Sequence, residues 1–280
     1  MSNSRKHTLA VITACIAFVI FGFSFMFSSI ALSITSTMVL LCFRFTVAVI
    51  TLTVVVAVNS LVGRIRGEAW FSFSLWGDPM GGLLLLGIGP PVLYLVFENS
   101  GIRDTSSAVT GTVLAVLPVS CLLADVFISR ESVSKLQVVC AVACVAGVAL
   151  VETGGETRIS FLGFFCLLMT LVCDVGYYIL SRRASRQFSP LEVTYVMFLM
   201  GMIVFVPAAL IQGRGQMAEL FLPAIQSAPF WGSVVFLGAV SSVGAYGLLN
   251  YANATLTNSE ASLIGNIATV VSVLAGVLLL

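Results

Sequence analysis

The sequence predicts an all-α integral membrane protein made of an inverted repeat of two five-helix halves. Three observations lead to this fold class. Charged residues make up 9% of the chain and hydrophobic residues 59%. The mean hydropathy of +1.10 lies outside the range of soluble domains. The pattern of long apolar stretches also recurs at an offset of about 152 residues.

Nine stretches of the chain are long and apolar enough to cross a bilayer, which takes about 20 residues of helix. We expect helices at 8–33, 36–61, 77–102, 106–129, 133–152, 160–181, 190–212, 230–253 and 259–280. Strands of a transmembrane barrel would be shorter and would alternate apolar with polar residues. Stretches such as 270–280 lack that alternation, so a barrel is excluded.

The distribution of Lys and Arg predicts a cytoplasmic N-terminus, because positive residues gather on the inner side of short loops. In that orientation the inner segments hold Arg5, Lys6, Arg64, Arg66, Arg130, Lys135, Arg182, Arg183 and Arg186. The outer segments hold Arg103, Arg158 and Arg214. The first span is too long for a removed signal peptide. We therefore expect a multi-pass protein of the plasma or inner cell membrane.

The recurring pattern divides the chain into residues 1–152 and 153–280. The offset carries Gly22 onto Asp174 in the first helix of each half, and Tyr94 onto Tyr246 in the third. With five helices in the first half, the second half enters the membrane from the opposite side, as in secondary transporters with a midplane site. The second half lacks its last helix. We expect a truncated chain, and the alternative is a protein that ends after nine spans.

Motifs along nearly the whole chain resemble the drug/metabolite transporter superfamily, and within it the EamA-type ten-helix transporters. The residues that carry the resemblance are Phe21-Gly22-Phe23-Ser24-Phe25, Phe43-Arg44-Phe45, Thr105-Ser106-Ser107-Ala108, Leu117-Pro118-Val119, Arg130-Glu131, Glu192-Val193-Thr194 and Ser259-Glu260-Ala261-Ser262-Leu263. The resemblance implies transport of amino acids, other metabolites or drugs, often as an exporter. Two positions depart from the pattern: Thr269 matches Pro118, and Asp174 replaces an apolar or small residue.

Arg44 is the clearest polar group at membrane depth, where an ionisable side chain is costly and usually faces the bundle interior. A guanidinium suits a substrate carboxylate, because it can donate two parallel hydrogen bonds. Two alternatives are a structural ion pair with an acidic neighbour and snorkelling to the outer interface. Glu98 is either that neighbour or an interfacial residue, and we favour the interface. Asp125 is expected to be solvated at the inner end of its helix.

Asp174 lies near the middle of the sixth span and shares a helix face with Tyr177 and Tyr178. It is predicted to bind a cationic solute or to carry a proton. The alternative, weighed equally, is a protonated carboxyl group that joins helices through hydrogen bonds. Tyr246 and Asn250 belong to a polar stripe on the eighth span, and such stripes line cavities. Interhelical hydrogen bonding alone is the competing explanation.

These features together predict a secondary carrier that works by alternating access. Its substrate-binding residues are predicted to be Arg44, Tyr94, Asp174, Tyr178, Tyr246 and Asn250. The expected partners are a small-molecule solute and the lipid bilayer, and protons are a further candidate. The protein is expected to be either a monomer or a homodimer. No nucleic acid, metal or cofactor is expected. The alternative is a membrane-embedded enzyme or helper for a lipid-linked substrate, which the single histidine and the lack of a nucleotide-binding loop disfavour.

Overall fold

The computed structural model describes residues 3–66, 90–105, 107–114, 116–128, 160–185 and 188–279, together with positions 135 and 139. Within these ranges the chain forms helices joined by turns, and no strand occurs among them. The span expected at 133–152 and the first part of the span at 77–102 lie outside the described residues.

The first half of the described chain contributes five helical segments. They are α1 (Asn3–Leu32), α2 (Thr37–Arg66), α4 (Pro90–Asp104), α5 (Ser107–Leu114) and α6 (Leu117–Phe127). The second half contributes α8 (Phe161–Ala184), α9 (Pro190–Gln212), α10 (Met217–Gln226), α11 (Ala228–Val235), the π-helix η1 (Phe236–Ala245), α12 (Tyr246–Asn253) and α13 (Asn258–Leu279). Because α11, η1 and α12 follow one another without a break, they act as one long helix.

Six helices in the described part of the chain are long and apolar enough to cross a membrane. They are Arg5–Leu32, Thr37–Val62, Phe161–Ala184, Pro190–Gln212, Ala228–Asn253 and Asn258–Gly276. A shorter apolar helix spans Leu117–Phe127. The prediction of an all-α membrane protein is therefore confirmed.

Three local features differ from the sequence-based expectation. The span expected at 106–129 is broken into α5 and α6, because Pro118 at the start of α6 has no N–H to continue the preceding helix. The segment after α9, expected to be a loop, forms the short helix α10. The span at 230–253 carries ten residues of π-helix in its middle. Such widened turns are rare and often occur at functional sites.

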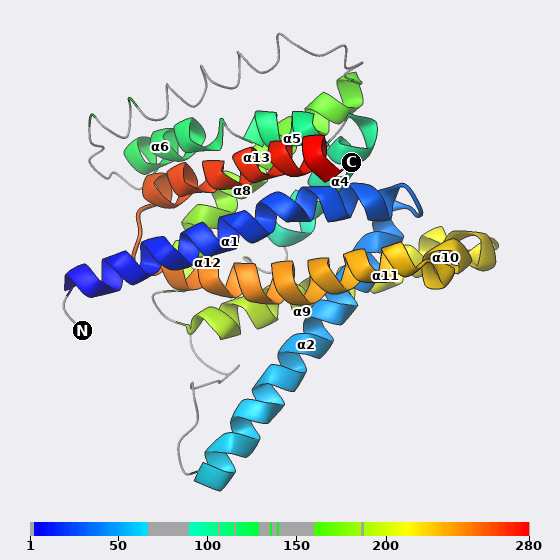
Figure 1. The fold of residues 1–280 in the computed structure, drawn as a ribbon, viewed down its shortest axis with the longest axis horizontal. Helices are drawn as coiled ribbons and strands as arrows, with labels where there is room; N and C mark the ends of the chain where they lie inside the picture. Colours follow the sequence, from blue (N-terminus) through cyan, green and yellow to red (C-terminus); the bar gives the residue numbers. More distant parts are fainter. Residues whose placement is uncertain are drawn as a thin grey trace.

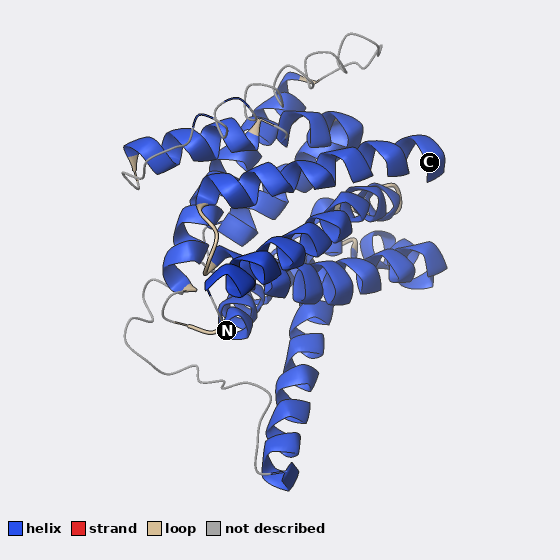
Figure 2. Ribbon diagram, turned by 60° about the vertical axis from the view of Figure 1, so that its left-hand side comes forward, coloured by secondary structure: helices blue, strands red, loops and turns tan. Residues whose placement is uncertain are grey.

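The helix α1 occupies the middle of the bundle, and Figure 1 shows it running between α13 on one side and the α11–η1–α12 helix on the other. The remaining helices pack as α4 on α8 and α2 on α9, and α13 also covers α5 and α6. The C-terminal part of α2 projects away from the other helices (Figure 2).

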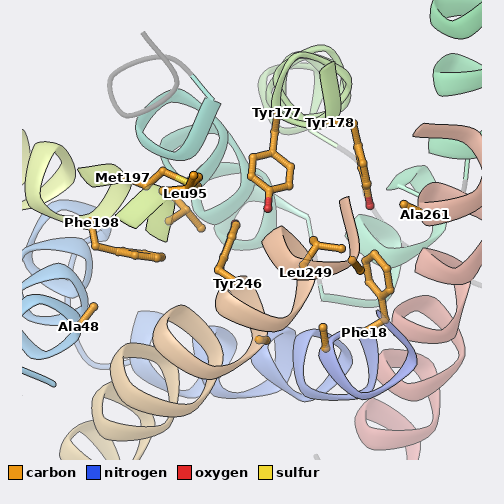
Figure 3. Close-up of a cluster of buried hydrophobic side chains, with 14 of the residues drawn as sticks. Phe18, Ala48, Leu95, Tyr177, Tyr178, Met197, Phe198, Tyr246, Leu249 and Ala261 are labelled. Carbon is orange, nitrogen blue, oxygen red and sulfur yellow. The ribbon is translucent and has the colours of Figure 1, made fainter. Parts of the chain in front are cut away.

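Small residues set the distance between the packed helices. A Cβ atom at Gly201 of α9 would lie 1.8 Å from the ring of Phe45 in α2. A Cβ atom at Gly22 of α1 would lie 2.5 Å from Val271 in α13. In membranes, where helix association depends on close packing rather than on burial from water, such glycines let backbones approach each other. The main core, part of which Figure 3 shows, gathers around Phe45, Tyr177 and Phe198.

Candidate functional site

A cavity lined by both polar and apolar side chains lies inside the bundle, between helices of both halves. Its volume is about 70 Å³, and a buried water molecule needs roughly 10–15 Å³ by the same measure. The lining comes from α1, α2, α4, α5, α6, α8, α12 and α13. The polar lining residues are Ser24, Arg44, Tyr94, Glu98, Asp174, Tyr177, Tyr178, Tyr246, Ser262, Asn266 and Thr269. The cavity thus lies between helices of both halves, and α2 contributes Arg44 to it.

Arg44 is held at the cavity wall by two serines of the π-helix. Its Nε donates to the Ser242 hydroxyl at 3.1 Å and its Nη2 to the Ser241 hydroxyl at 3.5 Å. The hydroxyl of Ser24 in α1 donates to Ser241 at 2.8 Å. A Cβ atom at Gly238 would lie 3.0 Å from the Arg44 carbonyl oxygen, so this glycine lets η1 approach α2 closely enough for the contacts.

The burial and the contacts of Arg44 bear on two alternatives raised by the sequence. The side chain is 2% exposed, so it does not snorkel to an interface. Within the described residues no carboxylate lies at ion-pair distance from the guanidinium. Its hydrogen bonds to Ser241 and Ser242 use the Nε and Nη2 groups, which leaves further N–H donors at the cavity.

Glu98 lines the cavity, and the expectation of an interfacial position was wrong. The residue is 6% exposed, and the hydroxyl of Tyr94, one helical turn earlier, donates to its carboxylate. The charges of Glu98 and Arg44 interact electrostatically although they are not in direct contact. The guanidinium therefore attracts the carboxylate of Glu98 across the cavity.

Asp174 points its carboxylate at the cavity from α8. Within the described residues this carboxylate has no hydrogen-bond or ion-pair partner, in contrast to that of Glu98. The ionisable side chains in its electrostatic surroundings are Tyr94, Glu98, Cys121, Cys173, Tyr177, Tyr178 and Tyr246. Glu98 repels it, and none of these groups supplies a positive charge.

Aromatic rings form a chain of contacts along the cavity wall. The ring centroids of Phe18 and Phe21 are 5.9 Å apart, and those of Phe21 and Tyr246 are 4.9 Å apart. Tyr246 then contacts Tyr177 at 5.6 Å, and Tyr177 contacts Tyr178 at 5.6 Å. Figure 3 shows Tyr177 of α8 and Tyr246 of α12 pointing toward each other, with Phe18 rising from α1. Edge-to-face packing fixes the orientation of all five rings.

Asn250 lies behind this wall and does not line the cavity. It is fully buried, and its Oδ1 accepts hydrogen bonds from Tyr177 at 2.8 Å and from Ser181 at 2.7 Å. Its Nδ2 donates to the hydroxyl of Thr194 in α9 at 2.9 Å. Asn253 donates to Ser181 at 3.1 Å. The predicted polar stripe thus joins α12 to α8 and α9, and Asn250 orients Tyr177.

Asp125 is buried, and the expectation of a solvated side chain was wrong. It is 1% exposed and accepts hydrogen bonds from Asn258 Nδ2 at 2.5 Å and from the Ser259 backbone N–H at 2.8 Å. A carboxylate at a helix N-terminus satisfies unpaired N–H groups and complements the helix dipole. Glu260 has a similar role, since it accepts from the Thr257 backbone N–H at 2.9 Å.

Five of the six predicted site residues meet at one cavity: Arg44, Tyr94, Asp174, Tyr178 and Tyr246. Several other lining residues were not among the predicted site residues, and they include Phe18, Phe21, Ser24 and Ser262. The phenylalanines belong to continuous apolar stretches, so periodicity gives no sign of which face is turned to the cavity. Ser24 stood in a motif, but its contact with Ser241 depends on the approach of α1 and η1.

Comparison with known proteins gives the family. The family model described as "EamA-like transporter family" matches residues 8–153 and 161–280. The chain belongs to the EamA-like transporter family. A relative from Bacillus subtilis (strain 168), named "Uncharacterized transporter YcxC", is 28% identical over 216 residues, which cover 75% of this chain and 69% of that protein. The EamA-like family and this named relative identify a membrane transporter.

A solved crystal structure has the same fold. It aligns with a TM-score of 0.65 at 21% sequence identity, over 97% of this chain and 87% of the other chain. Since the identity is low, this likeness concerns the fold alone. An EamA-like transporter of this fold has a bilayer as its surroundings and a small solute as its partner.

Proposed function

We propose that this EamA-like protein is a secondary carrier that moves small metabolites, such as amino acids or drug-like solutes, by alternating access. The observation that carries the proposal is the cavity inside an apolar bundle, with the three ionisable side chains Arg44, Glu98 and Asp174 on its wall. Ionisable groups at membrane depth are costly and mark substrate or ion pathways. In this proposal Arg44, Tyr94, Asp174, Tyr178 and Tyr246 contact the solute, and Asn250 positions Tyr177.

The distribution of lining residues over the two halves supports an inverted repeat of residues 1–152 and 153–280. Several lining residues are related by the offset found in the sequence. These pairs are Phe25 and Tyr177, Tyr94 and Tyr246, and Leu114 and Asn266. In this arrangement equivalent helices of the two halves face one cavity. Rocking of one half against the other can then expose the site to each side of the membrane in turn.

The unpartnered carboxylate of Asp174 supports coupling to an ion gradient. A group that exchanges a proton or a cation with the two sides of a membrane needs access to a watery space and no fixed partner. Asp174 lines the cavity and has no ion-pair partner within the described residues. Export across the plasma or inner membrane, with the N-terminus inside, is the direction and orientation that we propose from the family resemblance and the Lys and Arg distribution.

Counterflow in proteoliposomes tests the proposed function. Purified protein is reconstituted into vesicles loaded with a single unlabelled solute, and the entry of the same labelled solute is followed. The panel covers amino acids, organic amines, organic acids and neutral metabolites, and empty vesicles serve as the control. Saturable entry that depends on the internal solute is expected for at least one member. Passage of every member at rates that internal solute does not change would overturn the carrier proposal.

A further inference from the structure

A second hollow of the molecule is a groove on its outer surface, between α1, α9 and α12. Its volume is about 420 Å³, and its lining residues do not overlap with those of the central cavity. Apolar side chains from all three helices line it, among them Leu9, Leu191 and Leu248. Ligand pockets in proteins commonly measure about 300–1,000 Å³. The groove is therefore large enough to hold an elongated apolar ligand.

The groove opens onto a surface of α1 that faces lipid. Leu9, Ile12 and Ile16 are all exposed, and their spacing of three and four residues places them on one face of the helix. The helix itself is long and apolar enough to cross a membrane. An exposed apolar face on such a helix meets the acyl chains of the bilayer, so an acyl chain has direct access to the groove.

Two basic residues stand one turn beyond the groove, at the start of α1. Arg5 precedes Leu9 by four residues and Lys6 precedes it by three, so both continue the face of α1 that borders the groove. His7 lies on the opposite face and approaches Glu260 of α13, with 3.6 Å between Nε2 and the carboxylate. Lys6 is exposed and forms no ion pair within the described residues. This end of the groove therefore carries positive charge.

The groove also offers a hydrogen-bond donor at the same end. Tyr251 lies two residues before the end of α12, it is partly exposed, and its hydroxyl has no partner within the part of the chain that the structure describes. Figure 1 shows the start of α1 beside α12. The carboxylate of Glu192 in α9 is buried and accepts from the Ser189 backbone N–H at 2.8 Å. Its charge is thus held in the capping box of α9 and does not face the groove.

We propose that this groove binds an anionic phospholipid of the bilayer, with one acyl chain along Leu9, Leu191 and Leu248 and the phosphate near Lys6 and Tyr251. Basic residues at the ends of transmembrane helices attract anionic headgroups, and each buried methylene of the chain adds to the affinity. The bound lipid touches α1 of the first half and α9 and α12 of the second. The inference goes beyond the proposed carrier function and does not depend on which solute is carried.

Three probes separate the contribution of the headgroup from that of the chain. Phosphatidylglycerol is anionic, phosphatidylcholine with the same acyl chains is zwitterionic, and glycerol phosphate has no chain. Binding to the purified full chain in detergent is measured by native mass spectrometry, in which the two lipids differ in mass. We expect saturable binding of phosphatidylglycerol, about tenfold or more tighter than that of phosphatidylcholine. Glycerol phosphate is expected not to displace it.

Two matched pairs of variants locate the bound lipid. Lys6→Gln is expected to weaken phosphatidylglycerol binding by about fivefold, and Arg214→Gln, in the turn after α9, is expected to leave it unchanged. At Gly247 a Cβ atom would lie 3.9 Å from Leu191, so Gly247→Leu fills the groove. This change is expected to weaken both lipids by about tenfold or more. Its control is Gly232→Leu in the same long helix, where a Cβ atom meets nothing within 4 Å.

Several results would overturn the inference. They are equal binding of the two lipids, equal losses for Lys6→Gln and Arg214→Gln, or unchanged binding by Gly247→Leu. Gel filtration and thermal melting confirm that each variant is folded. If Gly247→Leu does not fold, the two lipids and the exposed pair of variants still decide the proposal. The counterflow panel is measured separately, so a failed lipid site and a failed carrier proposal are told apart.

Discussion

The carboxylate of Asp125 in α6 accepts a hydrogen bond of 2.8 Å from the backbone N–H of Ser259 at the start of α13. It also accepts from the side chain of Asn258 at 2.5 Å. A residue of the first half therefore caps a helix of the second half, and both helices border the cavity. Because a helix N-terminus has unpaired N–H groups and a partial positive charge, this contact fixes α13 against α6.

Asp125→Asn is expected to destabilise the protein. The amide of asparagine keeps the shape of the carboxylate but carries no charge. Its NH2 group can also face the N–H donors of Asn258 and Ser259, with which it cannot form a hydrogen bond. We expect the free energy of unfolding in detergent to fall by about 1–3 kcal/mol. The control is Glu219→Gln on the exposed surface of α10, with an expected change within about 0.5 kcal/mol. Equal stability of the two variants would show that the cap contributes nothing.

Asn250→Leu removes a buried amide that joins α12 to α8 and α9. The change leaves Tyr177, Ser181 and Thr194 without this partner. We expect a loss of about 1–3 kcal/mol in unfolding free energy, because buried polar groups become unsatisfied. The matched variant Asn253→Ala removes a single bond to Ser181, for which about 0.6 kcal/mol is expected. A larger loss for Asn253→Ala than for Asn250→Leu would contradict the assignment.

Gly201→Ala tests the contact between α9 and α2. The added methyl group would lie 1.8 Å from the Phe45 ring, so the helices must separate or the ring must leave its rotamer. Overpacking of this kind costs about 1–3 kcal/mol. Gly176→Ala is the control, because a Cβ atom there meets nothing within 4 Å. Thermal melting in detergent should show a lower midpoint for Gly201→Ala only, and an unchanged midpoint would disprove the close approach.

Gly265→Val tests the cavity without changing its charge. A Cβ atom added at Gly265 would lie 3.3 Å from the Phe18 ring, so a valine side chain fills the space beside the aromatic rings of the cavity wall. We expect solute binding to weaken by about tenfold or more. The control on the same helix is Gly276→Val, where a Cβ atom meets nothing within 4 Å and helix propensity changes equally. Equal binding by both variants would place the solute elsewhere.

The sequence predicts the helices of this protein better than their breaks. Long apolar stretches gave α1, α2, α8, α9 and α13 to within a few residues. The single span expected at 106–129 includes Pro118, which lies at the start of α6 in the structure. The π-helix η1 leaves no mark in composition or periodicity, because it depends on the packing of η1 against α2 and α1.

For the site, too, the sequence predicts some residues correctly and misplaces others. Arg44 and Asp174 stood out because charge at membrane depth is costly whatever the fold. The sequence placed Glu98 at an interface and Asp125 in solvent, since their positions near helix ends suggested access to water. The structure instead buries them, Glu98 beside Tyr94 and Asp125 beside Ser259. The burial of these two carboxylates depends on how the helices pack together, which the spacing of residues along one helix does not predict.

Uptake driven by an imposed pH gradient tests the central claim most directly. Proteoliposomes with the unaltered protein, Asp174→Asn or Glu219→Gln take up a labelled solute chosen from the counterflow panel, with and without the gradient. We predict that the gradient accelerates uptake by the unaltered protein and by Glu219→Gln, and that Asp174→Asn loses about tenfold or more of the driven rate. Equal gradient-driven uptake by Asp174→Asn and the unaltered protein would contradict a transport role for Asp174.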